Sequence, residues 1–165
     1  MATIKIAYSS KTAMTMAIAS LATSSTFLGG YESTEVDNTA NLYDDVMIEG
    51  LITTGTSPTV GTSILVYAWG ASVSLATTAK DTLDGTGSAE TLTVANPPFL
   101  HLIANIIVTA TSNVTYNFGL TSLAQVLGNM PPFWGLFITH NTAVNLNSTA
   151  GNHAMAYVGI THTVA

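Results

Sequence analysis

The strongest strand prediction in this sequence falls on Leu102-Ile-Ala-Asn-Ile-Ile-Val-Thr-Ala110, a run rich in β-branched residues and free of charge. Such composition is typical of a β-strand that packs against a core. A second run, Ser63-Ile-Leu-Val-Tyr-Ala-Trp69, is apolar at consecutive positions, so it would bury both of its faces. We therefore expect a layered β-structure in which residues 63–69 form a central strand.

Hydrophobic residues recur with a period of two elsewhere in the chain. Val46, Ile48 and Ile52 would share one face of a strand, and Gly50 between them predicts a bulge. The alternation over residues 114–120 predicts another strand, which we expect to form a hairpin with residues 102–110. Shorter strands are expected over residues 91–94, 133–139, 143–146 and 154–160, and one helical turn over residues 122–127, which Gly128 would end.

Eight or nine short strands with almost no helical pattern predict an all-β fold. We expect one domain, residues 1–165, built as a single antiparallel β-sandwich with jelly-roll-like topology. Residues 1–30 would form an edge strand or an arm that reaches a neighbouring subunit. Within them, residues 13–22 follow Lys5 and Lys11 and resemble a short signal peptide, but Thr15 interrupts the apolar run, so we favour a strand.

Charge is scarce and unevenly placed. The 165 residues contain three lysines, no arginine and nine acids, giving a formal charge of −6, and no Asp, Glu, Lys or Arg follows Glu90. So few cations exclude a sequence-independent nucleic-acid grip and disfavour an anionic membrane partner. The neutral residues 91–165 would instead provide contact surfaces, with solvent around the acids of residues 32–49 and 81–90. The absence of cysteine excludes disulfides, thiol catalysis and cysteine-bound zinc.

The acids gather within residues 32–49 and 81–90, where paired carboxylates could serve glycoside hydrolysis. We favour solvated loop acids, because Trp69 and Trp134 both belong to apolar strand patterns and would not line a cleft. Asp81-x-x-Asp84-Gly-Thr-Gly is the best candidate for calcium, since it offers oxygen ligands in a glycine-containing loop. An Asp-Gly turn needs no metal, however, and the spacing is not that of an EF-hand.

Histidines and hydroxyls carry no recognisable catalytic or metal motif. His140 and His153 would approach each other if residues 141–152 formed a hairpin, but histidines without metal are the favoured interpretation for these two, for His101 and for His162. Nothing marks one Ser or Thr as an activated nucleophile. We therefore predict no enzyme, no catalytic residue, no cofactor and no metal ligand.

Two stretches suggest a family. The first is Glu32-Ser-Thr-Glu-Val-Asp-Asn-Thr-Ala-Asn-Leu-Tyr43, followed by Thr53-Thr-Gly-Thr-Ser-Pro-Thr59. The second is Trp134-Gly-Leu-Phe-Ile-Thr-His-Asn-Thr-Ala-Val-Asn-Leu-Asn-Ser148, followed by Gly151-Asn-His-Ala154 and Tyr157. In composition and texture the chain resembles the small virion structural proteins encoded beside tailed-bacteriophage capsid genes. No functional residue is transferred on that likeness.

The resemblance implies a capsid decoration (cement) protein on the exterior of the virion. Its partners would be the major capsid protein and its own copies, as a dimer or trimer, with no nucleic acid and no membrane. The mechanism would be burial of neutral and apolar surface, repeated over a symmetric lattice. The alternative is a carbohydrate-binding head fibre or spike module that contacts the host, which would require exposed aromatics such as Tyr31, Tyr43, Phe99 or Trp134.

Overall fold

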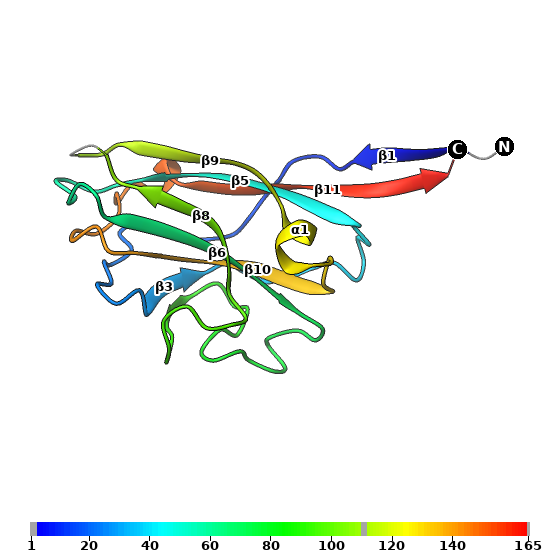
Figure 1. Ribbon diagram of the computed structural model, residues 1–165, viewed down its shortest axis with the longest axis horizontal. Coiled ribbons are helices and arrows are strands. Elements are labelled where there is room, and N and C mark those ends of the chain that lie inside the picture. The colour runs from blue at the N-terminus through cyan, green and yellow to red at the C-terminus, as the bar shows by residue number, and fades with distance from the viewer. Residues whose placement is uncertain (1–2, 110–111, 165) are drawn as a thin grey trace.

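The computed structural model describes residues 3–109 and 112–164, which form two antiparallel β-sheets packed face to face (Figure 1). Strands account for 46% of the residues and helices for 5%, so the predicted all-β sandwich is confirmed. The first sheet has the strand order β1-β11-β5-β9 with β2 beside β11. Its members are β1 (Ile4–Tyr8), β2 (Thr12–Ala13), β5 (Asp45–Thr53), β9 (Thr115–Ser122) and β11 (Ala154–Val164).

The second sheet has the order β7-β3-β10-β6-β8, with β4 beside β10. Its members are β3 (Gly29–Glu32), β4 (Val36–Asp37), β6 (Ser63–Ala71), β7 (Ala89–Thr91), β8 (His101–Ile107) and β10 (Phe133–His140). Two short helices complete the described chain, α1 (Leu123–Leu127) and the 3-10 turn η1 (Ala150–Asn152).

Strand pairing follows a nested pattern that defines the topology. β6 pairs with β8, β5 with β9, β3 with β10 and β1 with β11, so the chain behaves as one long hairpin wound around the core. Successive turns of this hairpin alternate between the two sheets. Eight strands connected in this way form a jelly roll, as the sequence predicted.

The main core lies between the sheets. β5 contributes Val46, Ile48 and Ile52, all fully buried. β10 contributes Trp134 and the apolar side chains at every second position after it, which share its inner face. The register of β5 against β9 shifts between Ile48 and Gly50, so the predicted bulge is confirmed. At Gly50 a Cβ would lie 2.4 Å from the Sδ of Met155, which explains the glycine there.

A second apolar cluster covers the outer face of the second sheet. Tyr67 and Trp69 of β6 and Phe137 of β10 point outward, where loop residues such as Leu83 and Leu92 bury them. Figure 1 shows these long loops, in green, beneath the sheet. This extra layer explains why β6 is apolar on both faces, and β6 lies between β10 and β8 as expected of a central strand.

The predicted hairpin between residues 102–110 and 114–120 is wrong. β8 pairs with β6 in the second sheet, whereas β9 pairs with β5 in the first. The connection between β8 and β9 therefore crosses from one sheet to the other. In a jelly roll, consecutive strands of the returning half of the long hairpin alternate between the two sheets. Val108 and Thr109 lie beyond the end of β8, and Ala110 lies outside the described residues.

The shorter elements match the sequence predictions only in part. The helical turn is confirmed: the Ser122 hydroxyl accepts a hydrogen bond from the Gln125 amide at 3.1 Å, and Gly128 ends α1 with a φ of 85°. The strand expected over 91–94 lies earlier, as β7, because Leu92 turns inward to the second cluster. Residues 143–146 form no strand; Ala143 has a φ of 67°, which extended pairing does not permit.

Residues 13–22 form a connecting segment, buried only at three positions, rather than the strand we favoured. Only Ala13 belongs to a strand, and Ser20 has a φ of 59°. Met14, Ile18 and Leu21 nevertheless reach the main core, so the apolar periodicity correctly indicated which side chains are buried. Its backbone makes isolated hydrogen bonds to separate parts of the chain, such as Met14 to Met155 and Ser20 to Asn147, and not the regular ladder of a strand.

Candidate functional site

An uncovered two-stranded ribbon extends from one end of the sandwich (Figure 1). We call it the arm: strand β1 paired with residues 160–164 of β11. Ile4, Ile6 and Tyr8 lie on one face of β1 and are 70%, 58% and 67% exposed, and the opposed Val164 is 75% exposed. Isolated two-stranded ribbons are at best marginally stable in water, so an exposed apolar ribbon indicates a contact surface.

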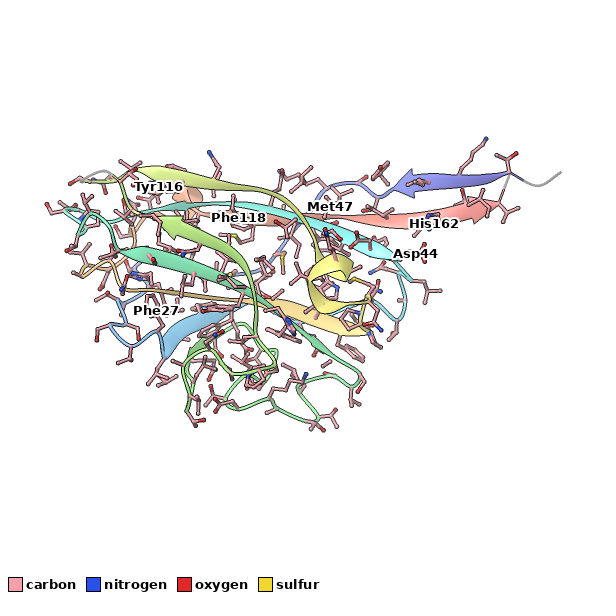
Figure 2. The ribbon with its side chains drawn as sticks, in the orientation of Figure 1. Phe27, Asp44, Met47, Tyr116, Phe118 and His162 are labelled. Atoms are coloured by element: carbon pink, nitrogen blue, oxygen red, sulfur yellow. The ribbon has the colours of Figure 1, made fainter. Side chains whose placement is uncertain are left out.

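Polar contacts fix the arm where it leaves the sandwich. The amide and the Nδ1 of His162 both lie within hydrogen-bonding distance of Asp44 Oδ2, at 2.8 and 2.9 Å, and Figure 2 shows the two side chains beside each other. These contacts hold the pKa of the exposed Asp44 carboxyl below its usual value. Ser9 and Gly159 exchange two further hydrogen bonds of 2.8 Å. The arm is thus anchored through His162, the cross-strand partner of Ile6, while Ile4, Ile6 and Tyr8 remain exposed.

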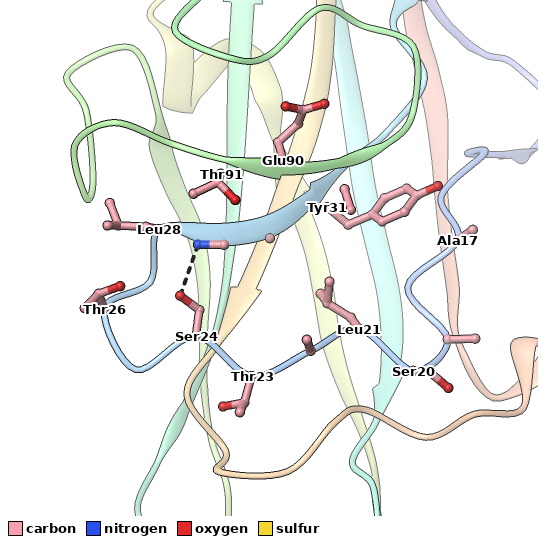
Figure 3. Close-up of a pocket in the computed structure, with 15 residues that line it drawn as sticks. Ala17, Ser20, Leu21, Thr23, Ser24, Thr26, Leu28, Tyr31, Glu90 and Thr91 are labelled. Atoms are coloured by element: carbon pink, nitrogen blue, oxygen red, sulfur yellow. Dashed lines mark hydrogen bonds between the residues drawn. The ribbon is translucent and has the colours of Figure 1, made fainter.

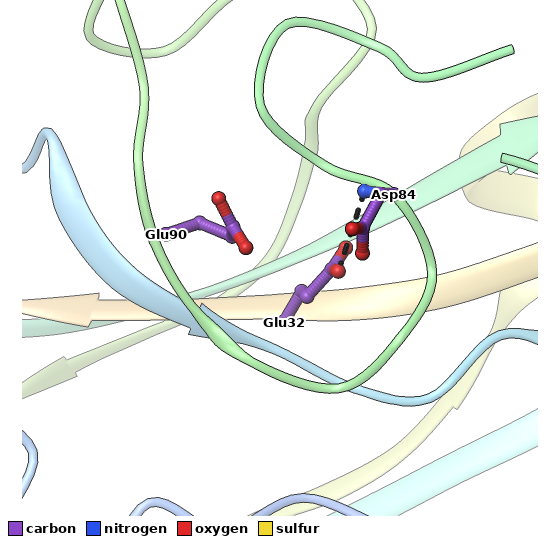
Figure 4. Close-up of side chains that lie close together, drawn as sticks. All are labelled: Glu32, Asp84 and Glu90. Carbon is purple, nitrogen blue, oxygen red and sulfur yellow. Dashed lines mark hydrogen bonds between the residues drawn. The ribbon is translucent and has the colours of Figure 1, made fainter. Parts of the chain in front are cut away.

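A cluster of three carboxylates lies at the second sheet, away from the arm. Its members are Glu32 of β3, Asp84 of the loop that precedes β7, and Glu90 of β7. Each places a carboxylate oxygen within 4.8 Å of the other two (Figure 4). We call it the carboxylate cluster. It is the one group of three or more potential metal-ligating side chains among residues 3–109 and 112–164.

Glu32 is the buried member of the carboxylate cluster. Its Oε1 accepts hydrogen bonds from the amides of Asp84 at 3.3 Å and Thr86 at 3.2 Å. Its Oε2 is buried and receives no hydrogen bond from the described residues. Burial, followed by the hydrogen bond that the protonated carboxyl makes to Asp84, raises the pKa of Glu32 to about 7. The site can therefore hold either a proton or a cation at neutral pH.

The two partially exposed carboxylates are held by the loop itself. Asp84 Oδ1 accepts from the Thr86 amide at 3.0 Å and from its hydroxyl at 2.6 Å, and the Thr86 hydroxyl bond is the main reason that the pKa of Asp84 is lowered. Glu90 Oε1 accepts from the Ser88 hydroxyl at 2.7 Å. Gly85 and Gly87 have φ angles of 77° and 78°, which let the loop turn tightly over Glu32.

The sequence drew attention to one member of the carboxylate cluster and misassigned another. Asp84 was, with Asp81, the best candidate for calcium, although a turn without metal was favoured and no metal ligand was predicted. Asp81 Oδ2 instead accepts from the Thr93 amide at 2.8 Å. Glu32 and Glu90 were interpreted as solvated acids, which is wrong for Glu32, because its side chain is fully buried. The Asp-Gly-Thr-Gly turn was a usable signal for Asp84, whereas only the pairing of β3 with β7 brings Glu32 and Glu90 to it.

Other acids accept hydrogen bonds from backbone amides instead of forming a second cluster. Glu35 Oε2 accepts from the Leu75 amide at 2.7 Å, and Asp45 Oδ1 accepts from the Ala124 amide at 2.9 Å beside the start of α1. Asp37 Oδ1 accepts from the Thr39 amide at 2.7 Å. The expected solvated, acidic side of the molecule is therefore only partly realised: several acids hold turns in place.

The histidines are not brought together. His140 is buried, with Nδ1 3.0 Å from the Thr142 hydroxyl and Nε2 3.0 Å from the Leu21 carbonyl, to which it donates. His153 contacts the Thr53 amide and the Asn147 carbonyl instead. No histidine belongs to a potential metal-binding group in the described part of the chain.

Burial lowers the pKa of His140, which gives a pH-dependent stability. The unfolded chain takes up a proton near the ordinary histidine pKa, whereas the folded chain resists it, so this contribution to stability is lost as pH falls through that range. We expect urea unfolding to show a larger loss of stability from pH 8 to pH 5 in the wild type than in His140→Gln, whose amide can still donate to the Leu21 carbonyl. Equal losses in both proteins would contradict this.

A groove of about 560 Å³ lies between residues 17–31 and strand β7 (Figure 3). Its walls carry small and hydroxyl side chains, including Ser24, whose Oγ accepts from the Gly29 amide at 3.0 Å. The carboxylate of Glu90 points away from the groove (Figure 3). No charged or convergent polar groups aim into it from the described residues, so it offers little for specific recognition.

The aromatic side chains that a glycan-binding face would need pack in or against the two apolar clusters. Trp134 is fully buried, as its apolar strand pattern indicated, so it cannot supply the exposed aromatic that the carbohydrate-binding alternative requires. Tyr31 and Tyr43 are half-buried against the main core, whereas Phe99 is half-buried against the outer cluster. The four side chains therefore divide between two clusters and do not form one exposed platform.

No protein family, curated protein or solved structure matches this chain. Within the described residues, no helix is long and apolar enough to cross a membrane. The class of protein is therefore defined by its fold and surfaces alone: a jelly-roll β-sandwich with a protruding apolar arm and a carboxylate cluster of which one member is buried.

Proposed function

We propose that this chain is a bacteriophage virion structural protein, a capsid decoration (cement) protein that stabilises the head through contacts with the major capsid protein and with its own copies. The observation that carries the proposal is the arm, whose apolar side chains are exposed on a ribbon that no other element within residues 3–109 and 112–164 covers. A subunit that works alone would gain nothing from such a surface, whereas an assembly component would bury it.

The arm is suited to a second copy of the same chain. Among the described strands β1 pairs only with β11, so one edge of β1 has backbone amides and carbonyls that no described strand pairs. Two arms meeting edge to edge would pair these groups and bring the Ile4 and Ile6 side chains of the two copies together on one face, in an isologous contact. The low charge of the chain would also keep such contacts insensitive to salt.

The fold and the packing of the aromatic side chains give further support. Jelly rolls occur in viral capsid proteins and in lectins, so the fold is compatible with both the decoration protein and the alternative carbohydrate-binding head fibre or spike. The packed state of Trp134 and Tyr43 weighs against the carbohydrate-binding alternative. The phage assignment itself rests on the resemblance in sequence texture.

Mass spectrometry and cryo-electron microscopy of phage particles that carry this protein would test the proposal. We expect many copies per head, in a fixed ratio to the major capsid protein, on the outer shell. Detection only in the tail, only at the tips of fibres, or in no particle would overturn it.

The arm can be tested separately with purified protein. We expect Ile6→Asp to weaken self-association and to raise its dissociation constant at least tenfold. The reason is that a charge would then lie in the contact between copies. Light scattering after size exclusion would measure this, with Val73→Asp as a control on another exposed residue, 52% accessible. A wild type that is monomeric at all concentrations would contradict this role of the arm.

A further inference from the structure

We infer that the carboxylate cluster of Glu32, Asp84 and Glu90 binds a calcium ion. The first observation is geometric: three carboxylate oxygens lie within 4.8 Å of one another. Calcium–oxygen distances are about 2.4 Å, so oxygens around one ion are separated by at most about twice that value. The three side chains can therefore share a single ion without any rearrangement of the backbone.

The second observation is the unpartnered oxygen of Glu32. This side chain is fully buried, its Oε1 already accepts from two amides, and its Oε2 accepts from none of the described residues. Figure 4 shows the Glu32 carboxylate directed toward Asp84, with Glu90 approaching from the other side. When Glu32 is ionised, this buried oxygen has no donor, which is costly. A cation between the three groups would then supply the partner that the proton shared with Asp84 supplies in the protonated form.

No side-chain cation of the described chain performs this task. The ion pairs within residues 3–109 and 112–164 are Lys11 with Glu49 and His162 with Asp44, both on the first sheet. Lys80 is the nearest lysine in sequence, but its Nζ donates to the Gly70 carbonyl at 2.6 Å. The negative charge of the carboxylate cluster is therefore balanced only from outside the protein.

The donor set selects the type of ion. All three ligands are carboxylate oxygens, which suit calcium and magnesium and disfavour the softer transition metals, which prefer nitrogen or sulfur. Calcium tolerates irregular geometry and a mixture of carboxylates and water, whereas magnesium demands a near-ideal octahedron. The ligands come from a strand, a loop and a second strand, which is an irregular arrangement of the kind calcium accepts.

An ion here would cross-link the outer layer of the molecule. Glu32 belongs to β3 beneath the loop, while Asp84 and Glu90 flank the turn that covers it. Binding would fix residues 84–90 over the second sheet and so protect the outer apolar cluster that contains Leu83. The site does not depend on the proposed function and would stabilise the fold in any setting.

Thermal unfolding of the full chain after EDTA treatment and dialysis tests the inference. We expect about 10 mM CaCl₂ to raise the melting temperature by about 5 °C or more, as saturation of a sub-millimolar site requires. NaCl of matched ionic strength should have no such effect, and titration calorimetry with CaCl₂ should show one ion per chain. MgCl₂ should give a smaller rise.

Variants of two of the three carboxylates test whether the response belongs to the carboxylate cluster. Asp84→Asn and Glu90→Gln change partially exposed side chains and should fold, yet each should lose the calcium-induced rise. Asp81→Asn, on the same loop but bonded to Thr93, should retain it. Absence of both heat and shift in the wild type, persistence of the shift in Asp84→Asn and Glu90→Gln, or an equal response to magnesium would overturn the calcium assignment.

Discussion

Replacing Trp134 with alanine is expected to lower the free energy of unfolding by about 3–5 kcal/mol, the range for removing a large buried aromatic side chain. Trp134 is fully buried on β10, and its ring meets Tyr157 of β11 edge-on, with centroids 5.1 Å apart. Tyr157 in turn contacts Tyr43 at 6.5 Å. These three rings join the two sheets, so the cavity left by the substitution would lie at the centre of the sandwich.

Two matched variants make the Trp134 prediction specific. Trp134→Phe should cost much less, because the indole Nε1 makes no hydrogen bond with the described residues and only part of the ring volume is lost. Tyr8→Ala removes an aromatic that is 67% exposed on the arm and should change the stability of the monomer by less than about 0.5 kcal/mol. Chemical denaturation would measure all three; a loss below about 1 kcal/mol for Trp134→Ala would contradict the packing described.

The same variant bears on the carbohydrate-binding alternative. If Trp134 contacted a glycan, its replacement would weaken binding and leave the fold intact. Its burial leads us to expect the opposite: reduced stability as the primary effect. An exposed glycan platform would have to be built from other residues, and the half-buried Tyr31 and Phe99 belong to different clusters.

Strand identity in this protein is encoded locally, whereas strand partnership is not. The alternation of Val46, Ile48 and Ile52 identified the buried face of β5, because side chains on a strand alternate with a period of two. Nothing in residues 102–120 reveals that β8 and β9 belong to different sheets, because a turn between alternating runs is equally compatible with a hairpin or a crossing between layers. That choice depends on the nested pairing of the whole chain.

The carboxylate cluster shows the same division between local and long-range information. The Asp84-Gly-Thr-Gly turn was recognisable from its residues, because positive φ angles at Gly85 and Gly87 follow from local chemistry. Glu32 lies more than fifty residues earlier and resembled any other loop acid in the sequence. Its burial follows from the placement of β3 against β7 beneath a loop, which is a property of the tertiary fold.

The arm could be predicted from the sequence only in part. The sequence predicted an arm or an edge strand within residues 1–30 and contact surfaces in the neutral residues 91–165. The structure locates the most exposed apolar strand at β1, with residues 160–164 of β11 as its partner, so the arm combines both ends of the described chain. Only strand pairing over such a separation in sequence could reveal this.

Replacing Glu32 with glutamine is expected to stabilise the metal-free protein at pH 8 by about 3 kcal/mol and to leave it nearly unchanged at pH 4. The pKa of Glu32 is raised from 4.5 to about 7 in the folded state, chiefly by burial, and each unit corresponds to about 1.4 kcal/mol. The folded wild type therefore holds a proton that the unfolded chain releases, and its stability falls as pH rises from about 4.5 to about 7. Glutamine carries no charge at either pH, and its amide can donate to Asp84 as the protonated carboxyl does.

Urea denaturation of both proteins in EDTA, between pH 4 and pH 8.5, would measure the difference. The two stability curves should coincide below about pH 4.5 and separate progressively up to about pH 7, with Glu32→Gln the more stable. Asp37→Asn, an exposed acid on β4, serves as the control and should not reproduce the separation. Parallel curves for the wild type and Glu32→Gln would contradict the burial of an ionisable carboxyl at this position. Calcium, if it replaces the proton as inferred, should restore the wild type at pH 8 and leave Glu32→Gln unaffected, because the variant lacks the charged ligand that the ion requires.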